Sequence, residues 1–122
     1  MARKKKVLVV DDESPIAEMI SEFCESFGYE TRIMTNGESV LAAAETFQPD
    51  IITLDIMMPG MSGMDVLKEL KMNPQTQNIP VLIISAMSDE DQVKSLLNES
   101  HGILAKPLKI KKLKSALDKI LP

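Results

Sequence analysis

Short apolar runs alternate along the chain with segments of helical periodicity. The runs are rich in β-branched residues and lie near positions 5–10, 30–34, 51–54, 81–85 and 102–105. Runs that are apolar on both sides of the pleat are typical of parallel strands covered by helices on both faces. The alternation therefore predicts an α/β fold with a five-stranded parallel sheet, in which the most polar run, 30–34, forms an edge.

Helix signals follow the first two runs. Ser14-Pro15 predicts an N-cap and a first-turn proline, and the first helix should end near Phe27-Gly28, where glycine can adopt a left-handed conformation. The second helix should follow Asn36-Gly37 and stop before Pro49.

The remaining three runs have helix signals as well. A third helix should follow Ser62-Gly63 and stop before Pro74, and Ser88 with Asp91 resembles a capping box for the fourth. The fifth has one apolar stripe on a lysine-rich helix, formed by Ile110, Leu113, Leu117 and Ile120. No repeat or linker interrupts the pattern, so a single domain is expected over 1–122.

Composition narrows the classes of function. The chain has 122 residues, 44% of them hydrophobic, which suffices for one buried core. A net charge of −4 argues against a dedicated nucleic-acid binder, and the lysines near the two ends are typical of solvated helix faces. No apolar stretch has the length of a signal-peptide core or a membrane span, so no membrane association is expected.

Cys24 is the only cysteine, so an intrachain disulfide is impossible. Its spacing from Ile16, Ile20 and Phe27 predicts a buried, inert thiol. A chain without disulfides fits a reducing compartment, and the cytoplasm is the expected location.

Three carboxylates follow two of the predicted strands. Asp11 and Asp12 end the first run, and Asp55 ends the third. Parallel strands bring such residues to one edge of the sheet, where carboxylates about 5 Å apart repel by roughly 3 kcal/mol at an effective dielectric of about 20. A divalent cation relieves this repulsion, so the sequence predicts an acidic Mg²⁺ pocket.

Two further polar residues stand at strand ends. Ser85 closes the fourth run and Lys106 follows the fifth. In an open α/β sheet, ligands bind beyond the carboxyl ends of the strands. Carboxylates, a hydroxyl and an ammonium group converging there could hold a phosphoryl group and transfer it to a carboxylate.

Four segments contain these residues: Val9 to Glu13, Leu54 to Gly63, Ile83 to Ala86 and Ala105 to Pro107. They resemble the signature segments of bacterial response-regulator receiver domains, and the likeness to chemotaxis regulators spans the whole chain. The resemblance implies a flavodoxin-like, doubly wound sheet in the order 2-1-3-4-5. It also implies a phosphorylation-controlled signalling protein that catalyses only its own phosphorylation and dephosphorylation.

The same resemblance assigns roles to individual positions. It makes Asp55 the phosphoacceptor, with Ser85 and Lys106 binding phosphoryl oxygens, and it implies a cis bond before Pro107. The implied Mg²⁺ ligands are Asp12, Asp55 and the backbone carbonyl of Met57, with Asp11 acting through water. The implied partners are a sensor histidine kinase or phosphotransfer protein and a downstream protein that the sequence does not identify. A homodimer after phosphorylation is also compatible with it.

Two other functions remain open at this stage. One is a Mg²⁺-dependent phosphohydrolase or phosphotransferase with an aspartate nucleophile, although so short a chain lacks an obvious cap to enclose a substrate. The other is the receiver part of a longer DNA-binding regulator.

Four further positions stand out. Ile103 occupies the place, three residues before Lys106, where receivers usually carry an aromatic side chain that turns inward on phosphorylation. Met57 and Met87 lie two residues beyond Asp55 and Ser85, where they could limit water access to a phosphoryl group. His101, the sole histidine, has no partner at ligand spacing and is expected at the surface.

Overall fold

One parallel sheet forms the centre of the molecule. The computed structural model describes residues 3–86 and 90–121, and within them the strand order is β2-β1-β3-β4-β5. The strands are β1 (Lys6–Val10), β2 (Glu30–Met34), β3 (Ile51–Leu54), β4 (Val81–Ser85) and β5 (Ile103–Ala105). The predicted doubly wound order is confirmed, and the most polar strand lies at an edge.

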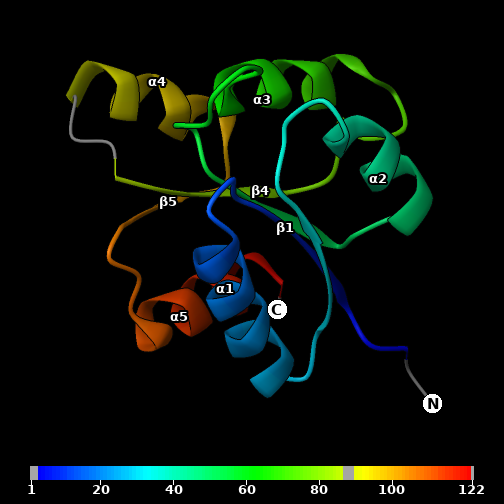
Figure 1. Cartoon of the computed structure of the whole chain (residues 1–122), viewed down its shortest axis with the longest axis vertical. Coiled ribbons are helices and arrows are strands. Elements are labelled where there is room, and N and C mark those ends of the chain that lie inside the picture. Colours follow the sequence, from blue (N-terminus) through cyan, green and yellow to red (C-terminus); the bar gives the residue numbers. More distant parts are fainter. Residues whose placement is uncertain (1–2, 87–89, 122) are drawn as a thin grey trace.

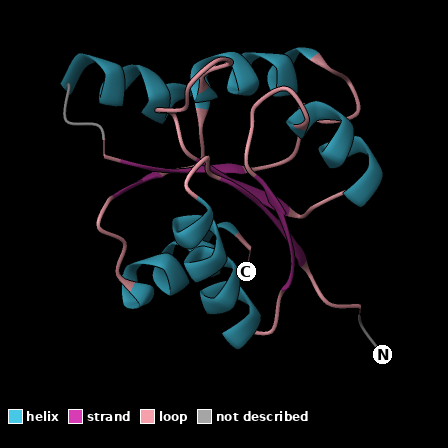
Figure 2. Cartoon of the chain, in the orientation of Figure 1, coloured by secondary structure: helices cyan, strands magenta, loops and turns pink. Residues whose placement is uncertain are grey.

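Helices cover both faces of the sheet (Figures 1 and 2). One layer holds α1 (Ser14–Ser26) and α5 (Ile110–Ile120), and the other holds α2 (Val40–Phe47), α3 (Gly63–Met72) and α4 (Glu90–Glu99). No helix within the described ranges is long and apolar enough to cross a membrane.

The three central strands alternate their side chains between two cores. Ile52, Leu54 and Ile83 pack on the side of α2, α3 and α4, whereas Ile51 and Ile84 pack on the side of α1 and α5. All five side chains are at most 1% exposed. Because each face of the sheet is buried, the strands have no polar side to present to water, which explains their continuous apolar sequence.

Helix α1 differs by one residue from its predicted start. Glu13, and not Ser14, is the N-cap, and its side chain makes no capping hydrogen bond. Pro15 remains in the first turn, where its missing N–H costs nothing, and Gly28 has a φ of +97° just beyond the end of the helix.

The other helix predictions agree with the structure in part. Helix α2 begins at Val40, three residues after Gly37, and α3 is capped by Ser62, whose Oγ accepts a hydrogen bond from the N–H of Asp65 at 3.3 Å. The predicted capping box of α4 depends on Ser88, which lies outside the described residues.

Cys24 is buried on α1, as its spacing predicted. Burial is the main cause that raises the pKa of its thiol to about 12, with a smaller contribution from the negative charge of Glu25. The thiol therefore stays protonated and unreactive in the folded protein.

Strand register aligns the ends of the central strands. Val10 of β1 pairs with Leu54 of β3, which pairs with Ile83 of β4. The residues that follow these positions therefore emerge at one edge of the sheet. This edge holds the candidate functional site.

Candidate functional site

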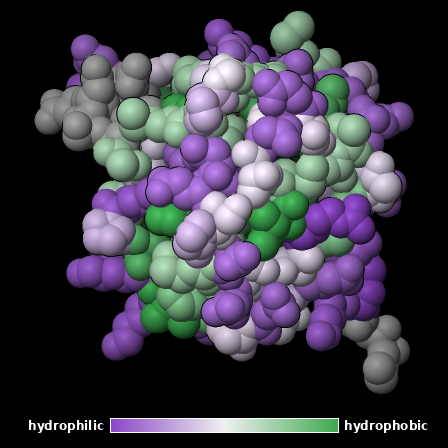
Figure 3. Space-filling model, viewed as in Figure 1, coloured by the Kyte–Doolittle hydropathy of each residue, from purple (hydrophilic) through white to green (hydrophobic). Residues whose placement is uncertain are grey.

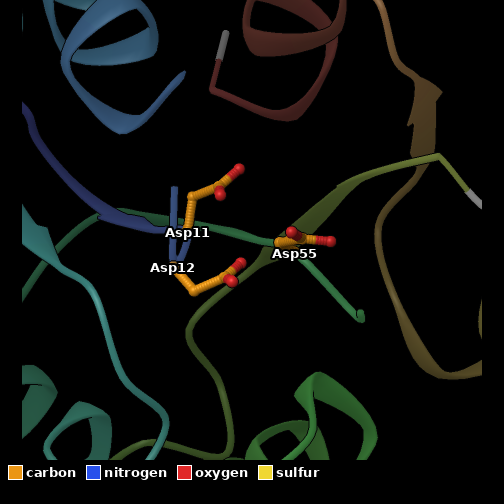
Figure 4. Close-up of side chains that lie close together, drawn as sticks. All are labelled: Asp11, Asp12 and Asp55. Carbon is orange, nitrogen blue, oxygen red and sulfur yellow. The ribbon is translucent and has the colours of Figure 1, made fainter. Parts of the chain in front are cut away.

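Three carboxylates gather at this edge, where β1 and β3 end (Figure 4). Asp11, Asp12 and Asp55 each offer an oxygen atom, and these atoms all lie within 4.8 Å of one another. Asp11 and Asp55 are buried, and Asp12 is half-buried. The predicted cluster is therefore present, and its charges are partly removed from water.

Backbone hydrogen bonds hold the two buried aspartates in place. The N–H of Asp11 donates to the carbonyl of Met34 at 3.1 Å, and the N–H of Asp55 donates to the carbonyl of Val10 at 3.0 Å. Both residues thus continue the sheet ladder by one step after the strands end. Their side chains leave from rigid backbone, which suits a site that needs fixed geometry.

Lys106 lies among the carboxylates. Its Nζ is 2.9 Å from Asp11 Oδ2 and 3.1 Å from Asp55 Oδ2, and it lies 3.9 Å from Glu13 Oε1. Burial alone lowers the pKa of Lys106, but its contacts with Asp11 and Asp55 outweigh burial and raise the pKa above its ordinary value. The ammonium group therefore remains charged and offsets part of the repulsion within the cluster.

Two backbone N–H groups orient the carboxylates further. Glu13 N–H donates to Asp11 Oδ1 at 2.9 Å, and Met57 N–H donates to Asp55 Oδ1 at 3.0 Å. The second oxygen of each carboxylate, Oδ2, faces Lys106 Nζ. Asp11 Oδ2 is buried, and its only partner among the described residues is Lys106 Nζ, so the oxygen keeps a lone pair for a second cation.

Ser85 ends β4 and is 1% exposed. Its Oγ has no hydrogen-bond partner within the described part of the chain, which is costly for a buried hydroxyl. The carbonyl of the same residue accepts a hydrogen bond from Lys106 N–H at 3.0 Å, so the two residues are tied together. The peptide bond between Lys106 and Pro107 is cis, as the sequence resemblance implied.

Glycines shape the loop after Asp55. Gly60 has a φ of +72°, which a residue with a side chain rarely adopts. Gly63 is needed for a different reason, since a Cβ at this position would collide with the carbonyl oxygen of Asp55 and with Ile56. The start of α3 thus packs directly on the backbone of the central aspartate.

The donor set fits a hard divalent cation. Mg²⁺ prefers oxygen ligands, and the three clustered carboxylates provide them. Lys106 already neutralises part of the charge. The arrangement resembles the Mg²⁺ site of receiver domains, and it could stabilise the negative oxygens of a phosphoryl group next to Asp55.

Sequence reasoning did not find every residue at the site. Glu13 is not among the predicted site residues, yet its carboxylate oxygen Oε1 lies 3.9 Å from Lys106 Nζ. In the sequence Gly63 signals only the start of a helix, whereas the structure also shows that it packs closely on the backbone of Asp55 and Ile56. Met57 is 62% exposed beside the site, and Met87 lies outside the described residues. His101 is exposed, as predicted, and its Nδ1 accepts a long hydrogen bond of 3.4 Å from Val81 N–H.

Comparisons with known proteins agree on one protein family. A family model described as the response regulator receiver domain matches residues 7–118. The chain is 35% identical over 118 residues to the phosphate regulon transcriptional regulatory protein PhoB of Pseudomonas aeruginosa, covering 96% of this chain and 52% of that protein. It is 37% identical over 108 residues to the probable transcriptional regulatory protein TcrX of Mycobacterium tuberculosis, covering 88% and 45% respectively. The chain thus spans about half the length of the curated relatives it matches.

Solved structures agree. The chemotaxis protein CheY4 of Vibrio cholerae superimposes with a TM-score of 0.90 at 29% identity, covering 98% of this chain and 100% of that one. A Francisella response-regulator receiver domain gives a TM-score of 0.86 at 33% identity, covering 96% of each chain.

Proposed function

The chain is a receiver domain of the two-component response regulators, and from this premise we propose that it accepts a phosphoryl group on Asp55. One observation carries the proposal. Asp55 ends the central strand of the sheet, and its Oδ2 lies 3.1 Å from Lys106 Nζ within an acidic cluster. An ammonium group at this place can neutralise phosphoryl oxygens as they approach the carboxylate.

The donor is a phosphohistidine of a sensor kinase or a phosphotransfer protein. A carboxylate oxygen of Asp55 attacks the phosphorus atom, and a P–O bond forms as the P–N bond breaks. The electron pair of the broken bond stays with the imidazole nitrogen, which then takes up a proton. The product is an acyl phosphate on Asp55.

Lys106 and Ser85 would bind the transferred group. Lys106 Nζ pairs with one phosphoryl oxygen, and this new partner substitutes for the contact that it makes with Asp55 Oδ2. The buried hydroxyl of Ser85, which has no partner among the described residues, donates to another phosphoryl oxygen. An unsatisfied hydroxyl at this position supports the assignment, because a phosphoryl oxygen would satisfy it.

Mg²⁺ would be held by Asp12, Asp55 and the backbone carbonyl of Met57, with Asp11 acting through water. When bound, the ion supplies positive charge that neutralises phosphoryl oxygens during transfer. The three carboxylates support this ligand set because their oxygens lie close together and two of them are buried. The backbone of Met57 lies next to these carboxylates, since its N–H donates a hydrogen bond to Asp55 Oδ1.

Phosphorylation would act as a switch and not as a step in substrate turnover. The domain would catalyse its own phosphorylation and dephosphorylation, and the phosphorylated form would bind a downstream protein or a second copy of the chain in the cytoplasm. Residues 1–122 would act as one receiver unit. A Mg²⁺-dependent phosphohydrolase is the competing class, and sustained turnover of p-nitrophenyl phosphate would favour it.

A second candidate function concerns the protein that contains this domain. The relatives PhoB and TcrX are named as transcriptional regulatory proteins, and the chain covers about half of each. We therefore propose, as the alternative, that the chain serves as the receiver part of a longer DNA-binding regulator. DNA binding would then belong to another part of that regulator.

The decisive experiment is intact-protein mass spectrometry after incubation with acetyl phosphate and Mg²⁺. We expect the mass of one added phosphoryl group, its loss in Asp55→Asn, and its loss in the presence of a chelator. Asp50→Asn is the matched control, because Asp50 precedes the same strand at the opposite edge of the sheet. Labelling that persists in Asp55→Asn, or that is indifferent to the chelator, would contradict the assignment.

A further inference from the structure

Among the described residues, two methionine side chains are exposed. Met57 is 62% exposed and Met72 is 83% exposed, whereas Met58, which follows Met57 directly, is 7% exposed. Apolar side chains on the surface otherwise lie in small patches between hydrophilic ones, as on the face drawn in Figure 3. A thioether that is open to water is also open to small oxidants, so Met57 and Met72 are the positions where oxidation is expected first.

The single thiol of the chain does not compete for such an oxidant. Cys24 is the only cysteine, and it is buried on α1. Burial raises the pKa of its thiol to about 12, so the thiolate, which is the form that peroxides oxidise, is absent at neutral pH. In the part of the chain that the structure describes, the sulfur atoms that meet a dissolved peroxide are therefore those of Met57 and Met72.

The two exposed methionines differ in what lies next to them. Met57 N–H donates to Asp55 Oδ1 at 3.0 Å, so this residue is bonded directly to the proposed phosphoacceptor carboxylate. Met72 is the last residue of α3, whereas Gly63, at the first turn of the same helix, is the residue that packs on Asp55. A chemical change at Met57 therefore alters the surroundings of Asp55, and the same change at Met72 does not.

We propose that Met57 is a reversible oxidation site at which hydroperoxides shorten the lifetime of the phosphorylated protein. The Met57 sulfur attacks one oxygen of hydrogen peroxide, so an S–O bond forms while the O–O bond breaks. The departing oxygen takes up the proton of the transferred oxygen and leaves as water. Sulfur loses two electrons, the peroxide gains them, and the side chain becomes methionine sulfoxide. The inference rests on the proposed function, since it assigns a form of regulation to the Asp55 site.

The effect follows from a change of polarity beside the acyl phosphate. A thioether is apolar and a weak hydrogen-bond acceptor, whereas a sulfoxide is polar. Water bound to the sulfoxide oxygen would lie next to a phosphoryl group on Asp55, which ends its strand within the carboxylate cluster of Figure 4. Water that is held close to the phosphorus atom attacks it more often than water that an apolar side chain keeps away.

The test begins with the full chain treated with a graded series of hydrogen peroxide concentrations, followed by catalase. Peptide mass spectrometry measures the sulfoxide at Met57 and at Met72 separately. The protein is then phosphorylated with acetyl phosphate and Mg²⁺, the donor is removed, and intact-protein mass spectrometry follows the loss of the phosphoryl group. We expect the decay rate to rise about threefold when Met57 is fully oxidised, and to return to its original value after treatment with methionine sulfoxide reductases.

The two exposed methionines provide a matched pair of variants. Met57→Leu and Met72→Leu each remove one thioether and keep an apolar side chain of similar volume. The quantity compared is the ratio of decay rates after and before peroxide within each protein, so a different starting lifetime does not affect the comparison. This ratio should be close to one in Met57→Leu and should equal that of the wild type in Met72→Leu. Circular dichroism checks that both variants are folded.

Four results would overturn the proposal. They are a Met57 that stays unoxidised while Met72 is oxidised, an unchanged or longer lifetime at full oxidation of Met57, an undiminished peroxide response in Met57→Leu, and a decay rate that follows the sulfoxide at Met72. Failure to label Asp55 in the untreated wild type would instead refute the proposed function. Labelling is measured before any peroxide is added, so the two failures can be told apart.

Discussion

The interior of the central strands and their carboxyl ends differ sharply, although the two regions adjoin in the sequence. Leu54 is fully buried among apolar side chains, whereas Asp55, the next residue, is 3% exposed and lies among three other charged groups. Interior positions gain stability from packing. The end positions carry charge and unsatisfied polar atoms that stability alone does not require, and that is where binding chemistry is expected.

The sharpest test of this difference substitutes two adjacent residues, one at a time. Leu54→Ala should lower the free energy of unfolding by about 3 kcal/mol, because it leaves a cavity in the core. Asp55→Asn should change it by less than about 1 kcal/mol, since Asp11 retains its contact with Lys106. Urea unfolding followed by circular dichroism measures both. Similar losses for the two variants would show that the carboxyl end is packed like the interior.

Alkaline pH should probe the interior through Cys24. Its pKa is about 12 in the folded protein and near 9.0 in an unfolded chain, so the unfolded state releases its proton first. The resulting stability is complete below pH 9 and is lost between pH 9 and about 12, with a slope approaching 1.4 kcal/mol per pH unit. Cys24→Ala should lack this component. Urea unfolding of the wild type and of Cys24→Ala at pH 8 and about pH 10 gives the comparison. An equal change in the free energy of unfolding between the two pH values in both proteins would contradict the prediction.

At the carboxyl end of β1, substitution of Asp12 should stabilise the metal-free protein, whereas substitution of Leu54 in the core destabilises it. Asp12→Asn removes one of three clustered negative charges and should raise the free energy of unfolding in chelator by about 1 kcal/mol. In Mg²⁺ the order should reverse, because the wild type then gains stability from the ion. Asp11→Asn is the companion variant, and its effect on Mg²⁺ affinity should be smaller. A destabilised Asp12→Asn protein in chelator would contradict the prediction.

A substitution of Met57 tests whether an apolar side chain shields the phosphorylation site from water. If its side chain limits attack by water, Met57→Asn should shorten the lifetime of the phosphorylated protein about two- to threefold. Met72→Asn is the control, since Met72 is also exposed but lies at the far end of α3. Decay of the acyl phosphate after removal of acetyl phosphate gives the rates. Equal lifetimes would exclude a gating role for Met57.

The smallest effect concerns Ile103, which packs beside the core and is stiff at its first torsion. Adding beryllofluoride and Mg²⁺, which mimic the phosphoryl group, should shift amide signals near Ser85 and from Met57 to Gly63 more than those of residues 102–104. Ile103→Phe should enlarge the response of residues 102–104. The reverse ranking in the wild type would show that isoleucine transmits the change as well as an aromatic residue.

Sequence periodicity was sufficient for the strands but not for their order. The apolar runs located every strand to within a residue, because a sheet buried on both faces requires continuous apolar sequence. Nothing in that pattern distinguishes one neighbour from another, and the order 2-1-3-4-5 came from the family resemblance. The N-cap of α1 was misplaced by one residue because Ser14 is a stronger capping residue than Glu13, which occupies the position without a side-chain bond.

The site was predictable in its residues and less so in its contacts. Asp11, Asp12 and Asp55 end strands, and parallel topology is enough to bring them together. The ion pair between Lys106 and Asp11 depends on how the chain turns after β5, and the proximity of Glu13 depends on the first turn of α1. Such contacts are set by side-chain directions in three dimensions, and sequence spacing does not encode them.

Gly63 has a mechanical consequence. Because this residue begins α3 and has no room for a Cβ against the carbonyl oxygen of Asp55, the helix and the aspartate share one rigid joint. A displacement of the Asp55 peptide unit would push on the first turn of α3, and a stiff helix of ten residues would carry that push toward Met72. The central aspartate and the far end of α3 are thus mechanically coupled through the backbone contact at Gly63.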